Sequence, residues 1–360
     1  MSPPSRLLAA LLAPAWMLLR VPALDAAEEP PLRKVQISIN AWEGYVEPCA
    51  PGFIAAMRER HHIEVEFVRT SATGLDSFRS HLRDHSADLV SPANDLLRTL
   101  KEEGLIRPLD PALVPNLAQI NPIILDNGYF RIDGRTWGAP FTYGPYALAY
   151  NRAKLAKPTT YEVLWDERWK GRVSVANYDT ANIYMVALAL HIPSSDLFKL
   201  SDAQLGRIEA KLRELHAQVG HYWADNLEPE SVKTIDLGTD WGIGVHLINS
   251  KGGDWAMTVP TEGATAWVDN WAISSAIDPA KLPLVHEFID YQISARVEAE
   301  VARHTSYGPA NFYATRYLTV AEKLEYHITD ADYLGRLILW QPLDAATLAR
   351  YQAAWKRATR

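Results

Sequence analysis

The chain has very little cysteine and no excess of positive charge. Cys49 is the only cysteine among 360 residues, so an internal disulfide is impossible. There are 36 Lys and Arg residues against 43 Asp and Glu residues, a formal net charge of −7. An acidic chain is a poor partner for nucleic acid and is compatible with cationic ligands. The composition therefore excludes a disulfide scaffold and argues against nucleic-acid binding.

The sequence also lacks the signatures of common enzyme classes. It contains no Gly-x-Ser-x-Gly elbow, no phosphate-binding Gly-rich loop and no His-Glu-x-x-His motif. His81 and His85 have the spacing of a metal-binding helix face, but a third ligand at a suitable spacing is missing. We therefore expect no catalytic residues, no metal and no cofactor.

The first 27 residues form a separate segment. Arg6 precedes an apolar run of 13 residues, Leu7 to Leu19, and small residues follow near Ala26 and Ala27. This order is typical of a secretory signal peptide, and the run is short for a membrane span. A buried first helix or an uncleaved anchor are the alternatives. Residues 1–27 hold Arg6, Arg20 and Asp25, so the mature charge would be −7 − 1 = −8. We expect an exported protein, either secreted or periplasmic.

The first third of the mature chain alternates strand and helix patterns. Strand patterns of period two are centred on Ile37, Val65 and Val90, and helical patterns cover Pro51–Arg60, Leu75–His85 and Asp95–Glu103. This order predicts an α/β fold with a mostly parallel sheet flanked by helices. Ligands of such sheets bind at the carboxyl ends of the strands. Those ends are Asn40 to Tyr45, Arg69 to Thr73 and Ser91 to Asp95.

The rest of the chain predicts a second α/β portion. A strand leads through Ala147 to Tyr150, and Ser201 with Gln204 forms a capping box before a leucine-rich helix. Further strands are expected at Val173–Ala176, Ile243–Ile248 and Ala256–Val259, and further helices at Leu282–Ile293, at Arg296–His304 and after Asp344.

The stretch Ala266 to Ile273 is the most informative in the chain. In a strand, Trp267, Asp269 and Trp271 would share one face, with a carboxylate between two indoles. Such a group suits a cation, because the carboxylate neutralises its charge and the ring adds about 0.5–2 kcal/mol. The alternative is a core strand whose Asp caps a neighbouring turn.

Tryptophan or tyrosine beside an acid recurs at predicted strand ends and loops. There are 12 tryptophans in the chain, and the indole N–H of each needs a partner when buried. The pairs are Trp42-Glu43 with Tyr45, Tyr178-Asp179, Asp240-Trp241, and Trp267 with Asp269. Together they favour a cleft that holds amines.

With these motifs, the chain resembles the periplasmic spermidine/putrescine-binding proteins of ABC importers, from about Ile37 to Gln341. The resemblance implies a two-lobed type II periplasmic binding protein with a ligand cleft between the lobes. It places residues 33–146 and 269–315 in lobe 1, and residues 147–268 and 316–360 in lobe 2. Closure would be a hinge motion about the segments that cross between the lobes.

The resemblance also implies site residues. The positions that match the family pattern are Trp42, Tyr45, Asp179, Trp241, Trp267, Asp269 and Tyr307, with Gln341 on a looser alignment. Four positions depart from it. Gly44 replaces an acid and leaves Glu43 one position earlier, Ala93 and Asp95 replace a serine and an aromatic residue, and Asn182 replaces a second acid. Glu43 and Asp95 are therefore candidates to supply the missing carboxylates.

The resemblance implies a monomer that captures a linear polyamine and delivers it to an ABC permease. Two alternatives use the same fold. The protein could sense a polyamine and dock on the periplasmic part of a signalling receptor, or it could bind another organic cation or an amino acid derivative.

Overall fold

In the computed structural model, residues 31–126, 128–328 and 330–360 are described. The predicted signal peptide, residues 1–27, lies outside the described residues, and Arg33–Arg360 forms one compact unit. Within the described ranges, no helix combines the length and apolar character that crossing a membrane requires.

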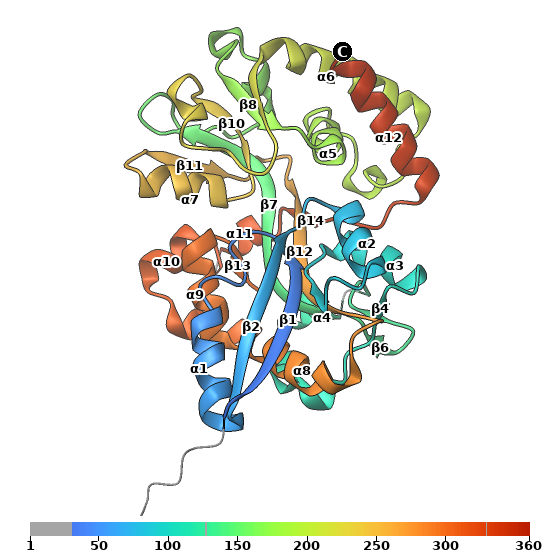
Figure 1. The fold of residues 1–360 in the computed structure, drawn as a ribbon. Helices are drawn as coiled ribbons and strands as arrows, with labels where there is room; N and C mark the ends of the chain where they lie inside the picture. Colours follow the sequence, from blue (N-terminus) through green and yellow to red (C-terminus); the bar gives the residue numbers. More distant parts are fainter. Residues whose placement is uncertain (1–30, 127, 329) are drawn as a thin grey trace, which may run out of the picture. The chain divides into compact units, whose positions relative to one another are not determined.

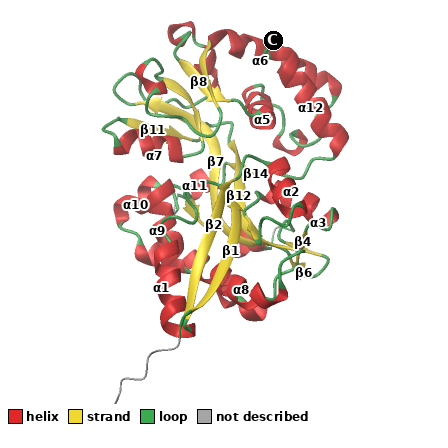
Figure 2. Ribbon diagram, viewed as in Figure 1, coloured by secondary structure: helices red, strands yellow, loops and turns green. Residues whose placement is uncertain are grey.

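One curved mixed sheet organises this unit (Figures 1 and 2). Its main path runs β2-β1-β3-β12-β7-β10-β8-β9, with β4, β11, β13 and β14 pairing to the side of that path. The strands are β1 Arg33–Ala41, β2 Ile63–Ser71, β3 Leu89–Val90, β4 Ile106–Arg107, β7 Ala139–Asn151, β8 Val173–Ala176, β9 Val219–Trp223, β10 Leu237–Asp240, β11 Trp255–Thr258, β12 Ala264–Ser274, β13 Gly308–Pro309 and β14 Leu337–Leu339, with β5 Arg131–Ile132 and β6 Arg135–Thr136 as a separate hairpin.

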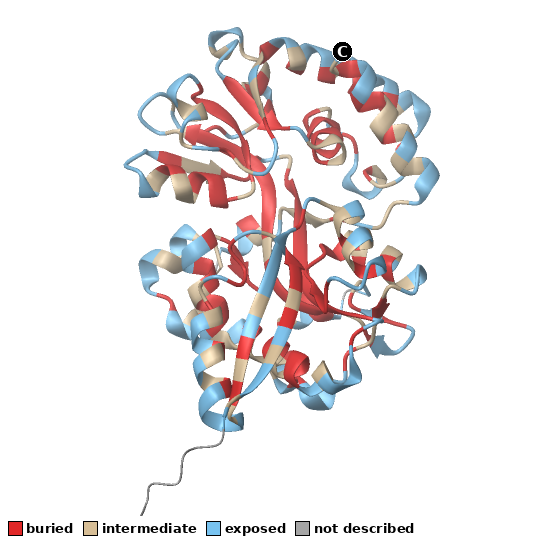
Figure 3. Ribbon diagram, in the orientation of Figure 1, coloured by how far each residue is buried: buried red, intermediate tan, exposed pale blue. Residues whose placement is uncertain are grey.

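Parallel pairs occupy both ends of the main path, as the strand and helix alternation predicts. β1 pairs in parallel with β2 and β3, and β8 pairs in parallel with β9 and β10. The two long central strands, β7 and β12, are antiparallel to each other, and all 11 residues of β12 are buried (Figure 3). Because strands buried on both faces read as continuous apolar runs, the stretch Ala266 to Ile273 is apolar nearly throughout.

Helices flank the sheet. α5, α6 and α12 pack against one another, and α9 packs on β7 and β13. The helices are α1 Ala50–His61, α2 Leu75–Arg83, α3 Asn94–Glu102, α4 Pro122–Leu125, α5 Asp179–Ala189, α6 Asp202–Gln218, α7 Ile243–Ser250, α8 Leu282–Gln292, α9 Ala295–Thr305, α10 Val320–Glu325, α11 Ala331–Leu334 and α12 Ala345–Ala358.

Local chemistry sets several of these boundaries. The predicted capping box at Ser201 and Gln204 begins α6, with both reciprocal hydrogen bonds present. The side chain of Asp344 accepts a hydrogen bond of 2.8 Å from the amide of Thr347 and so begins α12. Both predicted helix starts are confirmed.

The predicted strand Ile243–Ile248 is wrong, because these residues form helix α7. Asp240 Oδ2 accepts hydrogen bonds from the amides of Gly242 (3.0 Å) and Val245 (2.8 Å) at the start of this helix. Gly242 itself has a φ of +125°, which favours glycine and turns the chain out of β10. The short apolar run resembles a buried strand, and the carboxylate two positions before its N-cap selects the helix.

Candidate aromatic ligand pocket

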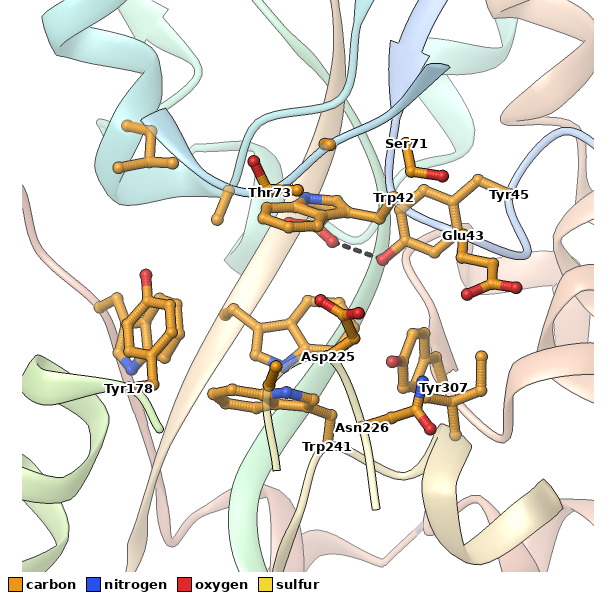
Figure 4. Close-up of a pocket in the computed structure, with 18 residues that line it drawn as sticks. Trp42, Glu43, Tyr45, Ser71, Thr73, Tyr178, Asp225, Asn226, Trp241 and Tyr307 are labelled. Atoms are coloured by element: carbon orange, nitrogen blue, oxygen red, sulfur yellow. Dashed lines mark hydrogen bonds between the residues drawn. The ribbon is translucent and has the colours of Figure 1, made fainter. Parts of the chain in front are cut away.

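A pocket of about 240 Å³ lies where the predicted strand ends meet (Figure 4). Residues from all three predicted carboxyl ends line it, and further residues come from β12 and from the segments that follow β9 and β10. Seven of the ten site residues predicted from the sequence line the pocket: Trp42, Glu43, Tyr45, Trp241, Trp267, Asp269 and Tyr307.

Asp269 is the buried acid of this pocket. Its side chain is 5% exposed, and it accepts a hydrogen bond from the hydroxyl of Tyr45. Burial raises the pKa of Asp269 well above its ordinary value, the hydrogen bond from Tyr45 opposes that shift, and the nearby charge of Asp95 adds to it. The described residues supply no Lys, Arg or His partner to Asp269, so a bound cation would be its first counter-charge.

The backbone around Asp269 is held by the segment before α3. Ala93 forms a β-bridge with Asp269, and Asn94 Oδ1 accepts a hydrogen bond of 2.9 Å from the amide of Val268. The side chain of Asn270 donates a hydrogen bond of 2.6 Å to the carbonyl of Pro92. Because β12 is fixed on both sides of the carboxylate, Asp269 is positioned before any ligand arrives.

Aromatic rings cover one side of Asp269. The Trp267 and Tyr307 rings meet edge to face with centroids 4.6 Å apart, and the Tyr45 ring lies 6.3 Å from Tyr307. Gly144 in β7 permits this packing, because a Cβ atom at this position would lie 2.7 Å from the Trp267 ring. Trp271 does not line the pocket: it is fully buried against Phe141 and Phe288.

A second aromatic group surrounds Trp241. The centroid of its ring lies 4.7 Å from that of Tyr146, and the rings of Tyr178, Trp223 and Trp340 lie at 5.9, 5.7 and 5.9 Å. Trp241 follows Asp240, which is fully buried and begins α7. Burial raises the pKa of Asp240 to about 6, and the amides that it binds oppose the shift.

Asn182, at a position where the resemblance implies an acid, forms hydrogen bonds that hold the aromatic group around Trp241. It is fully buried and accepts a hydrogen bond of 2.9 Å from the Tyr146 hydroxyl, and it donates one of 2.7 Å to the carbonyl of Ala176. Asn182 therefore positions Tyr146, the ring against which Trp241 packs, and does not line the pocket.

Three predicted site residues do not line the pocket. Asp179 lies in the first turn of α5, where its carboxylate accepts a hydrogen bond of 2.7 Å from the amide of Thr180 and interacts with Gln352. Gln341 is exposed, and its neighbour Trp340 lines the pocket instead. Asp95 lies in the first turn of α3 beside two lining residues, with a buried Oδ1 that has no hydrogen-bond partner among the described residues. Burial raises the pKa of Asp95 to about 7.

Sequence reasoning did not name several lining residues as site residues, although Tyr178 belongs to a predicted aromatic–acid pair. Tyr178 and Trp340 stack with ring centroids 6.0 Å apart, and each precedes a residue that the family resemblance implies. Asp225 and Asn226 follow β9 in a loop where no motif marks them. The remaining lining residues are Ser71, Ala72, Thr73 and Ala93, which lie in the predicted strand ends without being named individually, and Leu96, Ala224 and Ile243, which no pattern indicated.

Comparisons with known proteins identify the family of this chain. A model of a family described as bacterial extracellular solute-binding proteins matches residues 52–316. The chain is 23% identical over 234 residues to "Spermidine/putrescine-binding periplasmic protein 1" of Haemophilus influenzae, covering 64% of this chain and 63% of that protein. It is 21% identical over 283 residues to "Spermidine/putrescine-binding periplasmic protein" of Escherichia coli, covering 77% and 78%.

Among solved structures, a putative spermidine/putrescine ABC transporter from Listeria monocytogenes has a TM-score of 0.77 to this chain. The two are 19% identical, and the match covers 90% of this chain and 98% of the other. At this level of identity the likeness shows a shared fold.

Proposed function

We propose that this chain, which belongs to the bacterial extracellular solute-binding proteins, captures a linear polyamine of the putrescine or spermidine type. The family is a class of solute-binding proteins and not of enzymes. The observation that carries the proposal is the pairing of Asp269, buried and without a basic partner among the described residues, with the rings of Trp267 and Tyr307.

This pairing has the chemistry that an ammonium group needs. Moving an unpaired ammonium out of water costs several kcal/mol, and a carboxylate offsets that cost by neutralising the charge. Rings near the cation contribute about 0.5–2 kcal/mol more, and burial of each methylene contributes about 0.8 kcal/mol. Trp42 and Trp241 provide flat surfaces for the methylenes.

The charge of the pocket favours a purely cationic solute. Its described lining includes three carboxylates, those of Glu43, Asp225 and Asp269, and no Lys, Arg or His. A ligand that itself carries a carboxylate, such as an amino acid derivative, would be repelled unless a basic side chain paired with it. The lining therefore supports a polyamine over the amino acid derivatives that the sequence left open.

The names of the relatives support a cellular location for this function. Those reported above are named as periplasmic binding proteins, and we extend that location to this chain, with residues 1–27 as its export signal. Delivery to an ABC permease and hinge closure of residues 33–146 and 269–315 on the rest of the chain belong to the same proposal.

The test is ligand binding to the mature chain, residues 28–360. Tryptophan fluorescence and melting temperature are measured with putrescine, cadaverine, spermidine and spermine, and with choline and γ-aminobutyrate as controls. A ligand at 100 times its Kd adds about 2.7 kcal/mol to stability, which a melt detects. We expect stabilisation by one or more polyamines, and a loss of affinity of at least tenfold in Asp269→Asn.

A matched variant controls for charge. Asp254→Asn removes an exposed carboxylate that pairs with Arg152 outside the pocket, and it should leave affinity unchanged. Stabilisation by none of the polyamines would overturn the function, and an Asp269→Asn affinity within threefold of the original would overturn the site.

A further inference from the structure

Two exposed carboxylates lie on opposite walls of the pocket. Glu43 follows β1 and Asp225 follows β9, strands near opposite ends of the main path of the sheet. Figure 4 shows Glu43 beside Trp42 on one wall and Asp225 beside Trp241 on the other. Segments far apart in the sheet thus bring two negative charges to one cavity.

Among the described residues neither carboxylate has a basic partner, although acids close to them in the sequence do. Glu47 pairs with Arg69 at 2.5 Å, and Glu230 pairs with Lys233. Within the described part of the chain, no Lys, Arg or His forms an ion pair with Glu43 or Asp225. Like charges that face one cavity repel each other, and a cation between them reverses the sign of the interaction.

The third carboxylate of the cavity lies deeper. Asp269 is 5% exposed, whereas Glu43 and Asp225 are exposed. Asp269 therefore lies inside the cavity, and the other two carboxylates lie near its opening. The indoles of Trp42 and Trp241 line the same cavity. One carboxylate lies deep in the cavity, two lie at its mouth, and indole rings line the same cavity. This arrangement fits a molecule with a cationic group at each end and an apolar chain between them.

We propose that Glu43 and Asp225, with the side-chain amide of Asn226, form a second ammonium site at the mouth of the pocket. The ligand is then an unbranched dication or longer polyamine: one ammonium binds Asp269 and the next binds between Glu43 and Asp225. An ammonium carries three donors, enough for both carboxylates and the Asn226 carbonyl oxygen. This second site rests on the proposed function. It makes Glu43 and Asp225 the residues that distinguish a diamine from a monoamine.

The test compares putrescine with n-butylamine, which has the same four-carbon chain and lacks the second ammonium. Kd values for both are measured by calorimetry with the wild type, Glu43→Gln, Asp225→Asn and the double variant. Glu228→Gln is the matched control, because Glu228 is an exposed acid of the same loop that does not line the pocket.

We expect each single variant to lose at least tenfold in affinity for putrescine and to stay within threefold for n-butylamine. The double variant should bind the two amines with nearly equal affinity, and Glu228→Gln should behave as the wild type. If the wild type binds putrescine and the variants keep that affinity, or lose both amines equally, the second site is overturned and the proposed function stands. If the wild type binds neither amine nor any longer polyamine, both fail.

Discussion

Tyr45 and Asp269 lie 224 positions apart in the chain, and the hydroxyl of Tyr45 donates a hydrogen bond to the carboxylate of Asp269. Tyr45 is 1% exposed, and its ring also packs edge to face on Phe141, with centroids 5.1 Å apart. The hydroxyl thus partly replaces the water that the buried carboxylate has lost. It also leaves Asp269 able to accept a cation from the pocket side.

Tyr45→Phe should therefore lower both stability and affinity. The change leaves a buried carboxylate oxygen without its partner, which costs about 1–3 kcal/mol, and raises the pKa of Asp269 further. We expect a smaller free energy of unfolding in urea and weaker polyamine binding at pH 7. Tyr161→Phe is the control, because the buried Tyr161 hydroxyl has no described partner and its removal should be neutral or stabilising. Equal losses in the two variants would contradict a special role for the Tyr45 hydroxyl.

The burial of Asp95 leads us to predict that the melting temperatures of Asp95→Asn and the wild type differ by an amount that depends on pH. Burial raises its pKa to about 7, so the folded chain holds this proton more tightly than the unfolded chain. The stability that Asp95 contributes is complete below about pH 4 and is lost as the pH rises through about 7. Without ligand, Asp95→Asn should gain melting temperature relative to the wild type as the pH rises from 5 to 8, by about 2 °C or more. The exposed Asp332→Asn is the control for the loss of a carboxylate. A constant difference for Asp95→Asn would show that this carboxyl titrates normally.

Trp340 should matter more for binding than Gln341. Trp340 is 6% exposed and lines the pocket, and its ring stacks on that of Tyr178 at an interplanar angle of 18°. Gln341 is exposed and does not line the pocket. We expect Trp340→Ala to weaken polyamine binding more than tenfold and Gln341→Ala to change it by less than threefold, measured by calorimetry. The opposite order would support the residue that the family resemblance implies.

Two glycine variants should separate local crowding from a general effect. A Cβ atom at Gly144 would lie 2.7 Å from the Trp267 ring, so Gly144→Ala must displace that ring. Overpacking costs about 1–3 kcal/mol, and we expect affinity to fall about tenfold. Gly206 lies in α6 with no atom within 4 Å of a Cβ atom, so Gly206→Ala should stabilise the chain by up to about 1 kcal/mol with affinity unchanged. Retained affinity in Gly144→Ala would mean that the Trp267 ring is not needed in this position.

Much of this fold could be predicted because its signals are local. The Ser201 capping box, the β12 stretch around Asp269 and the strand ends at Tyr45 and Thr73 depend on residues close together in the sequence. The predicted family and the α/β binding-protein fold are confirmed. The lobe boundaries remain predictions.

The rest depends on features that periodicity and residue type alone do not encode. α7 has the composition of a strand, and the carboxylate of Asp240 selects the helix. The resemblance implies Asp179 and Gln341 as site residues, and their neighbours Tyr178 and Trp340 line the pocket. No local pattern shows which residue of each pair faces the cavity, and the roles of Asp179 and Gln341 stay predictions. Asp225 is a single acid in a loop, and it becomes informative only when Glu43 is seen across the same cavity.

The pocket takes residues from Trp42, just after β1, to Trp340, just after β14. A folding chain therefore has no complete binding surface until these distant segments have assembled. A ligand that binds only the assembled surface, and not the folding transition state, leaves the folding rate unchanged and slows unfolding. Bound ligand would thus lengthen the lifetime of the folded molecule without changing the rate at which it folds.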